Sequence, residues 1–198
     1  CLSERYQSEV LSEIPEVDAV VGIGSNEKIC DIVKKVLDGE QVESYGDKEN
    51  LPLCGERVLA NLPFYAYVKI AEGCNNCCTY CAIPSIRGKF RSRTIESVIE
   101  EVTDLASKGI TEFILVAQDT TRYGEDLYGE SKLSELLREI CKIDGVHWVR
   151  TLYCYPERIT DELIKTVAEE PKCVKYFDIP IQHCNSEVLK RMNRKGDK

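Results

Sequence analysis

From residue 64 onward the sequence alternates between short apolar runs and amphipathic segments, and this alternation limits the possible folds. Four apolar runs have the length of strands, at residues 65–70, 112–117, 147–153 and 174–179. Segments with helical spacing follow them, at residues 94–109, 131–142, 160–169 and 185–193. Strand–helix units in series predict a parallel sheet covered by helices. Right-handed crossovers curl such a sheet, so we predict an α/β fold with a partial parallel (β/α) barrel.

The first part of the chain has a different pattern. Residues 2–14 have the pattern of a helix, residues 17–23 that of a buried strand, and a second helix begins at Ser25 or Asn26 and ends at Gly39. Residues 40–63 are polar, with Gly and Pro breaks, and this favours a linker. We therefore divide the chain into a first domain at 1–50, a linker at 51–63 and the barrel at 64–198.

Composition and charge exclude several classes of protein. The 198 residues carry a net charge of -8, which makes the chain a poor nucleic-acid binder and suits a basic partner. Neither an apolar run long enough for a membrane span nor a signal peptide is visible. The cysteine count is 11, an odd number in a long chain, and this favours a reducing cytoplasm over a disulfide framework. The chain begins at Cys1 and its one methionine is Met192, so we expect a fragment.

Four cysteines lie within eight residues, in the run GCNNCCTYCAIP. Cys74, Cys78 and Cys81 have the spacing C-x3-C-x2-C, and three thiolates on a four-iron cube leave one iron open for catalysis. Cys77 offers an alternative spacing, but Tyr80 directly before Cys81 favours Cys78. A zinc site is the competing interpretation, although zinc usually takes two separated cysteine pairs. The remaining cysteines beyond Cys1 share no spacing, and we expect small apolar fillers at 30, 54, 141, 154, 173 and 184.

Polar side chains fall near the ends of the predicted strands. In parallel barrels the carboxyl ends of the strands carry the functional groups. Gln118 and Asp119 follow the second strand, Arg150 lies in the third, and His183 follows the fourth. We interpret all four as candidate cofactor-binding residues. The alternatives are helix-capping loop residues at 118 and 119, an ion pair of Arg150 with an acid such as Asp178, and a structural role for His183.

These motifs together resemble a known family. A C-x3-C-x-aromatic-C loop after a first barrel strand resembles the radical S-adenosylmethionine (SAM) superfamily, and EGCNNCCTYCAIPSIRGKFRSR is similar to its methylthiotransferases. The runs LVAQDTTRYGEDLYG, VRTLYCYP and YFDIPIQHCNSEVLKRM are similar to the branch that modifies a ribosomal protein. The tRNA-modifying branch has Asn, and not Asp–Thr–Thr, after the Gln. The resemblance extends from residue 1 to 198.

The resemblance implies a multidomain enzyme. Residues 1–50 would be the tail of an N-terminal α/β methylthiotransferase domain, and a C-terminal β-barrel would be absent. That N-terminal domain carries a second 4Fe–4S cluster, and the context CLSERY makes Cys1 its last ligand, with the other two missing. No catalytic side chain is assigned beyond the cluster ligands.

The resemblance also implies a reaction. The open iron held by Cys74, Cys78 and Cys81 would bind SAM and, with an external electron donor, generate a radical. This radical would remove hydrogen from the β-carbon of an aspartate in small-subunit ribosomal protein twelve, and a methylthio group would replace it. Two alternatives remain open: a tRNA adenosine methylthiotransferase, and a zinc-stabilised protein-binding module without catalytic activity.

Overall fold

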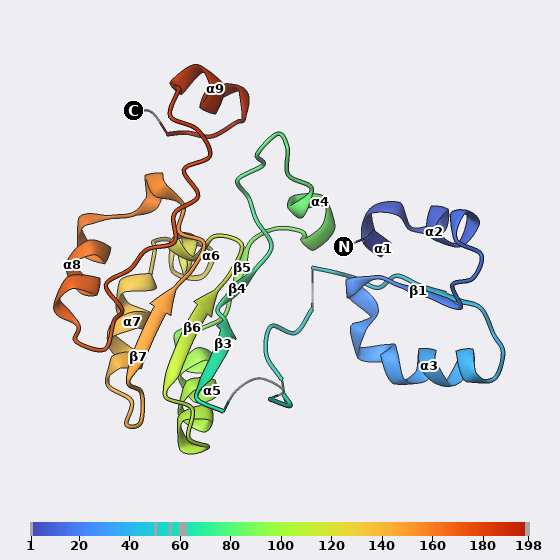
Figure 1. Ribbon diagram of the computed structural model, residues 1–198, viewed down its shortest axis with the longest axis horizontal. Coiled ribbons are helices and arrows are strands. Elements are labelled where there is room, and N and C mark those ends of the chain that lie inside the picture. The colour runs from blue at the N-terminus through green and yellow to red at the C-terminus, as the bar shows by residue number, and fades with distance from the viewer. Residues whose placement is uncertain (1, 50, 56, 60–62, 197–198) are drawn as a thin grey trace. The chain divides into compact units, whose positions relative to one another are not determined.

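The computed structural model describes residues 2–49, 51–55, 57–59 and 63–196 (Figure 1). The chain divides into two compact units. The first contains residues 1–52 and 81–89, and the second contains residues 53–80 and 90–198. The cysteine loop is therefore divided, because Cys74, Cys77 and Cys78 belong to the second unit whereas Cys81 begins the segment that belongs to the first.

The first unit is a small α/β layer. Its strands β1 (Ala19–Val21) and β2 (Val42–Ser44) pair in parallel. Its helices are α1 (Leu2–Tyr6), α2 (Ser8–Glu13), the 3-10 helix η1 (Ile23–Lys28), α3 (Ile29–Leu37) and α4 (Ile83–Arg87). The predicted helix at 2–14 is interrupted, because Gln7 has a φ of 40°. The expectation that residues 40–44 are linker is wrong, since β2 completes the sheet there.

The second unit is built on an open parallel sheet in the order β3-β6-β7. These strands are β3 (Tyr65–Lys69), β6 (Glu112–Val116) and β7 (Trp148–Thr151). The helices that follow them are α5 (Ile95–Ser107), α6 (Glu125–Tyr128), α7 (Leu133–Cys141), α8 (Asp161–Glu169) and α9 (Ser186–Arg191), with 3-10 turns η2 (Thr120–Arg122) and η3 (Pro156–Arg158). A short antiparallel pair, β4 (Ala71–Glu72) with β5 (Arg91–Ser92), brackets the cysteine loop.

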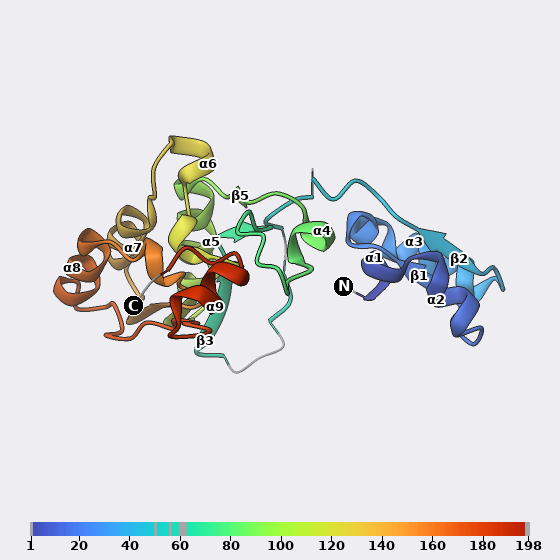
Figure 2. The same ribbon diagram turned by 90° about the horizontal axis from the view of Figure 1, so that it is seen from above.

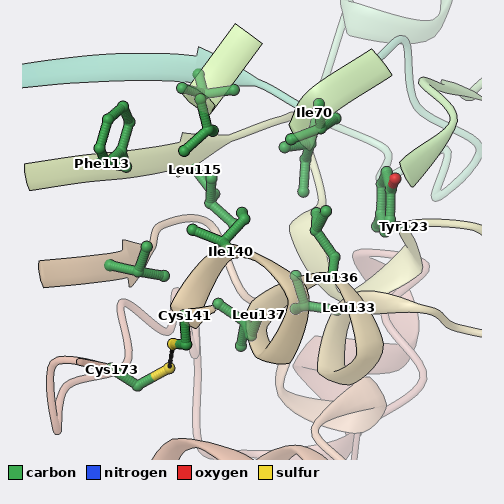
Figure 3. Close-up of a cluster of buried hydrophobic side chains, with 14 of the residues drawn as sticks. Ile70, Phe113, Leu115, Tyr123, Leu133, Leu136, Leu137, Ile140, Cys141 and Cys173 are labelled. Carbon is green, nitrogen blue, oxygen red and sulfur yellow. Dashed lines mark hydrogen bonds between the residues drawn. The ribbon is translucent and has the colours of Figure 1, made fainter. Parts of the chain in front are cut away.

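The core lies between one face of this sheet and helices α5 and α7 (Figures 2 and 3). Val68 and Leu115 are paired in register and both are fully buried. Leu136 and Ile140, one turn apart on α7, fill the space above them. The opposite face of the sheet is open, and Tyr67 there is 49% exposed. Alternation of buried and more exposed side chains orients the outer strands β3 and β7, whereas the central strand β6 is buried at three consecutive residues, Phe113, Ile114 and Leu115.

Most of the predicted elements of the second unit are confirmed, and one is wrong. The strands at 65–70, 112–117 and 147–153 and the helices at 94–109, 131–142, 160–169 and 185–193 are present with slightly shorter bounds. The fourth strand at 174–179 is absent: the amide of Val174 donates to the carbonyl of Val149, and the ladder then ends. Tyr176 is half exposed, so that run has no covered second face. The fold is α/β with an open sheet and not a closed barrel.

Within the described ranges, no helix combines the length and the apolar content needed to cross a lipid bilayer.

Candidate functional site

The cysteine loop leaves the sheet at the carboxyl end of β3 through β4. Gly73 turns the chain with a φ of 78°, and Cys77 also lies in the left-handed region, at 49°. The side chains of Cys74 and Cys78 are partly buried, while Cys77 is exposed. The amide of Asn76 donates to the Cys74 sulfur over 3.5 Å, a contact that stabilises a thiolate.

The chemistry of this loop fits an iron–sulfur cluster. Its cysteines include a partly buried pair, Cys74 and Cys78, which are two of the three ligands predicted from the sequence. Cys81 is exposed at the start of the 81–89 segment. Among the described residues, no three His, Cys, Asp or Glu side chains already converge closely enough to hold a metal ion. The assignment of Cys74, Cys78 and Cys81 as ligands therefore rests on their spacing, and Cys1 lies outside the described residues.

Gln118 and Asp119 follow β6 at the same edge of the sheet as the cysteine loop, but their environments differ. The Asp119 carboxylate is 1% exposed and accepts hydrogen bonds from Asn76 Nδ2 at 2.9 Å and Thr121 Oγ1 at 2.6 Å. The Gln118 side-chain oxygen is buried and has no hydrogen-bond partner in the part of the chain that the structure describes. An orphaned buried acceptor costs free energy unless a ligand supplies a donor. Gln118 therefore fits a cofactor contact better than Asp119 does.

Two arginines surround the Asp119 carboxylate. Arg122 donates to Asn76 Oδ1 at 3.1 Å, and its Nε lies 3.9 Å from the Asp119 carboxylate. Arg158 Nε lies at the same distance from Asp119. Both arginines also form ion pairs with Glu125. These contacts neutralise a carboxylate whose burial would otherwise be costly.

A cavity of about 280 Å³ opens beside the cysteine loop. Its walls include Asn75 and Asn76 from the loop, Arg122 and Arg158 from the two 3-10 turns, and Asn193 from the chain after α9. It is therefore a polar, cation-lined space at the carboxyl edge of the sheet, as expected for the functional edge of a parallel α/β fold.

Arg150 does not lie at this edge. It pairs with Ile114 in the sheet register, and its guanidinium forms an ion pair with Glu112, the first residue of β6. This is the structural alternative that the sequence left open, with Glu112 in place of Asp178. Asp178 instead accepts a hydrogen bond from the Tyr153 amide at 2.9 Å.

His183 is exposed, and its described hydrogen bond is local. Its Nδ1 accepts a hydrogen bond from the Asn185 amide at 2.9 Å. The Asn185 side chain in turn caps α9 by accepting from the amides of Glu187 and Val188. These contacts correspond to the structural alternative for this histidine.

Sequence reasoning missed a group of residues that reach the cysteine loop from the chain after α9. Arg194 is 6% exposed, and its guanidinium lies 4.1 Å from the centre of the Tyr155 ring. Burial raises the pKa of Tyr80, the neighbouring Cys78 raises it further, and Arg194 lowers it. Nothing local to residues 192–194 in the sequence indicated these contacts.

Comparison with protein families and curated sequences agrees with this geometry. The model described as the Radical SAM superfamily matches residues 68–198. A protein of Caldanaerobacter subterraneus named ribosomal protein uS12 methylthiotransferase RimO is 51% identical over 98% of the chain. A protein of Clostridium botulinum with the same name is 52% identical over 100% of the chain. The chain spans about 45% of the length of each relative.

Solved structures show the same fold at low identity. The cobalamin-dependent SAM radical enzyme OxsB aligns over 100% of the chain and 32% of its own length, with 13% identity and a TM-score of 0.59. The radical SAM methyltransferase TsrM of Kitasatospora setae aligns over 63% of the chain and 24% of its own length, with 20% identity and a TM-score of 0.51.

Proposed function

The chain belongs to the radical SAM superfamily, and from this premise we propose that it is part of a methylthiotransferase that modifies a ribosomal protein. One observation carries the proposal. Relatives about 50% identical over the whole chain are named ribosomal protein uS12 methylthiotransferases. The proposed reaction replaces a hydrogen on the β-carbon of an aspartate in small-subunit protein twelve with a methylthio group, and it takes place in the cytoplasm.

Cys74, Cys78 and Cys81 would hold a 4Fe–4S cluster, and Cys1 would contribute to a second one. When bound and reduced by an external donor, the first cluster supplies the electron that cleaves SAM. The open acceptor of Gln118 would receive a hydrogen bond from the amino group or a ribose hydroxyl of SAM. We propose Gln118 as the cofactor contact. We propose structural roles for Arg150, through its ion pair with Glu112, and for His183, through its hydrogen bond with the Asn185 amide, and Asp119 is held by Asn76 and Thr121.

The charge of the chain supports a protein substrate over a tRNA. A net charge of -8 attracts a basic ribosomal protein and repels phosphates. A tRNA adenosine methylthiotransferase remains the second candidate, because it would use the same cluster chemistry. Asp119, Thr120 and Thr121 carry the sequence difference that favours the first candidate.

Mass spectrometry distinguishes these substrates. Small-subunit protein twelve and tRNA are compared between cells with and without the intact protein. Loss of the methylthio mass from protein twelve alone is the expected result, and loss from tRNA alone would establish the second candidate.

The cluster is tested on the chain itself after anaerobic reconstitution with iron and sulfide. Replacing Cys74, Cys78 or Cys81 with serine is expected to remove iron and SAM cleavage, whereas Cys77→Ser is the matched control that keeps both. Purification with one bound zinc and no iron would establish the protein-binding alternative.

A further inference from the structure

Asn76 lies within the cysteine loop between Cys74 and Cys78, and both ends of its side-chain amide are held. Its Nδ2 donates to Asp119 Oδ2 at 2.9 Å, and its Oδ1 accepts from Arg122 at 3.1 Å. The amide of the same residue donates to the Cys74 sulfur. A displacement of the Asn76 side chain would therefore also move the thiol of a cluster ligand.

Asp119 is itself fixed to the sheet. Its second carboxylate oxygen accepts from Thr121 Oγ1, and that hydroxyl oxygen accepts from the Tyr155 amide at 3.2 Å. Thr120 Oγ1 donates to the Leu152 carbonyl at 2.8 Å. These hydrogen bonds join the segments that follow β6 and β7. Asp119 connects them to the cysteine loop through its hydrogen bond with Asn76. Both oxygens of Asp119 are used in this role.

A second contact holds the loop from the other side. Asn193 Nδ2 donates to the Cys77 carbonyl at 2.9 Å, and the Thr79 amide donates to the Met192 carbonyl at 3.1 Å. Cys77 is the residue with a left-handed backbone, a conformation that costs free energy outside glycine. A hydrogen bond on its carbonyl stabilises that conformation, and the conformation directs Cys77 outward between the two partly buried cysteines.

We propose that Asp119 and Asn193 are positioning residues for the cluster, acting through Asn76 and through the Cys77 carbonyl. The inference rests on the proposed function, because it assumes a cluster on this loop. Groups that orient metal ligands in this way typically change metal retention by about 10- to 100-fold when they are replaced. Their effect is on the arrangement of the thiolates before iron binds, so it is separable from contact with SAM.

An exchange of two side chains tests the first contact. Asp119→Asn leaves Asn76 and Thr121 competing for one acceptor oxygen, and it is expected to speed iron loss to a chelator about tenfold. Adding Asn76→Asp to the same chain restores the hydrogen bond between positions 76 and 119 with donor and acceptor exchanged, because the amide at 119 then donates to the carboxylate at 76. That carboxylate can still accept from Arg122. The double variant is expected to regain most of the parent's iron retention.

Asn193→Asp tests the second contact independently. It keeps the shape and tolerates the left-handed φ of 56°, but it removes the donor to the Cys77 carbonyl. A smaller increase in iron loss is expected, because Asn193 is exposed and water competes for the carbonyl. Asn193→Asp decides the proposal if Asp119→Asn does not fold.

Two controls separate positioning from general stability. Asp104→Asn makes the same chemical change on the exposed surface of α5, and Thr94→Ala weakens the cap of that helix. Both are expected to retain iron at the parent's rate. The electron paramagnetic resonance spectrum of the reduced cluster is expected to change in Asp119→Asn and Asn193→Asp only.

Parent-like iron loss in both positioning variants would overturn the inference, and so would a folded exchange variant that fails to recover. A parent chain that takes up no cluster would instead overturn the proposed function, so the two failures are distinct.

Discussion

The sulfur atoms of Cys141 and Cys173 lie 3.7 Å apart in the core of the second unit, where both side chains are buried (Figure 3). Cys141 is the last residue of α7, and Cys173 lies beside β7 through its bridge to Val149. The hydrogen bond with Cys141 and burial both raise the pKa of the Cys173 thiol. The folded protein therefore keeps this thiol protonated at a pH where the unfolded chain ionises it.

Stability is expected to fall in mildly alkaline solution for this reason. A group with a raised pKa contributes its stability fully below the pKa of the unfolded thiol, about 8.5, and loses it as the pH rises above that value. Burial raises the pKa of Cys154 as well and acts in the same direction, whereas the hydrogen bond with Cys173 lowers the pKa of Cys141 and offsets part of the loss. Urea unfolding under reductant at about pH 7.5 and about pH 9.5 measures the loss. Cys173→Ala should reduce the difference between the two, and an unchanged difference would exclude Cys173 as a source.

Arg150→Gln separates a structural role from a cofactor role. The ion pair with Glu112 is partly buried, with side-chain exposures of 32% and 14%. Its loss is expected to lower the free energy of unfolding by about 1 to 2 kcal/mol, between the values for exposed and buried pairs. Iron content and SAM cleavage are expected to stay at the parent's level.

Glu112→Gln is the matched partner variant, and the double variant should cost less than the sum of the two single changes. A loss of SAM cleavage in Arg150→Gln at unchanged stability would instead show that Arg150 contacts the cofactor.

Local patterns in the sequence predicted the elements whose burial is regular. Helices α5 and α7 each carry a continuous apolar stripe, and β6 is a continuous apolar run. Such patterns can be recognised in the sequence without knowing which elements they pack against. The strand β2 was missed because Glu43 is exposed and the run is short. The run 174–179 resembles a strand in composition, but the bridge that joins this segment to β7 runs from Val149 to Cys173, just before the run. Tertiary contacts decide whether such a run pairs as a strand.

The same distinction applies to the candidate site. The choice of Cys78 over Cys77 used only local information, the Tyr80 that directly precedes Cys81, and it stays a prediction. The roles of Asp119 and Asn193 depend on contacts to residues 43 and 116 positions away, and no local pattern contains them. Cysteines chosen as apolar fillers were right at 141, 154 and 173, which are buried, and wrong at 30, 54 and 184, which are exposed.

Thr94 caps α5, since its side chain accepts a hydrogen bond from the Ser97 amide at 3.2 Å. Thr94→Ala is expected to lower the free energy of unfolding by about 1 kcal/mol, because one amide at the start of α5 loses its partner. Thr94→Ser keeps the acceptor and should stay within a few tenths of a kcal/mol of the parent. Equal losses in both variants, measured by urea unfolding, would contradict the capping role.

The basic run 87–93 contains one arginine that is part of the interior. Arg93 is 4% exposed and donates to the Lys69 carbonyl at 3.0 Å and to the Ser97 carbonyl at 2.7 Å, and it also forms an ion pair with Glu101. Its removal takes these donors away from the part-buried carbonyls of Lys69 and Ser97, while Glu101 keeps its second partner, Arg57. Arg93→Met is therefore expected to lower the free energy of unfolding by about 2 to 4 kcal/mol.

Arg93→Lys is expected to recover little of this loss, because an ammonium cannot reproduce the planar set of donors that reaches three groups at once. Lys89→Met, at an exposed position of the same run, should change stability by less than about 0.5 kcal/mol. Urea unfolding of the three variants measures the contrast. A fully stable Arg93→Met would mean that its carbonyl partners find other donors, and Arg93 would then be available for a substrate contact.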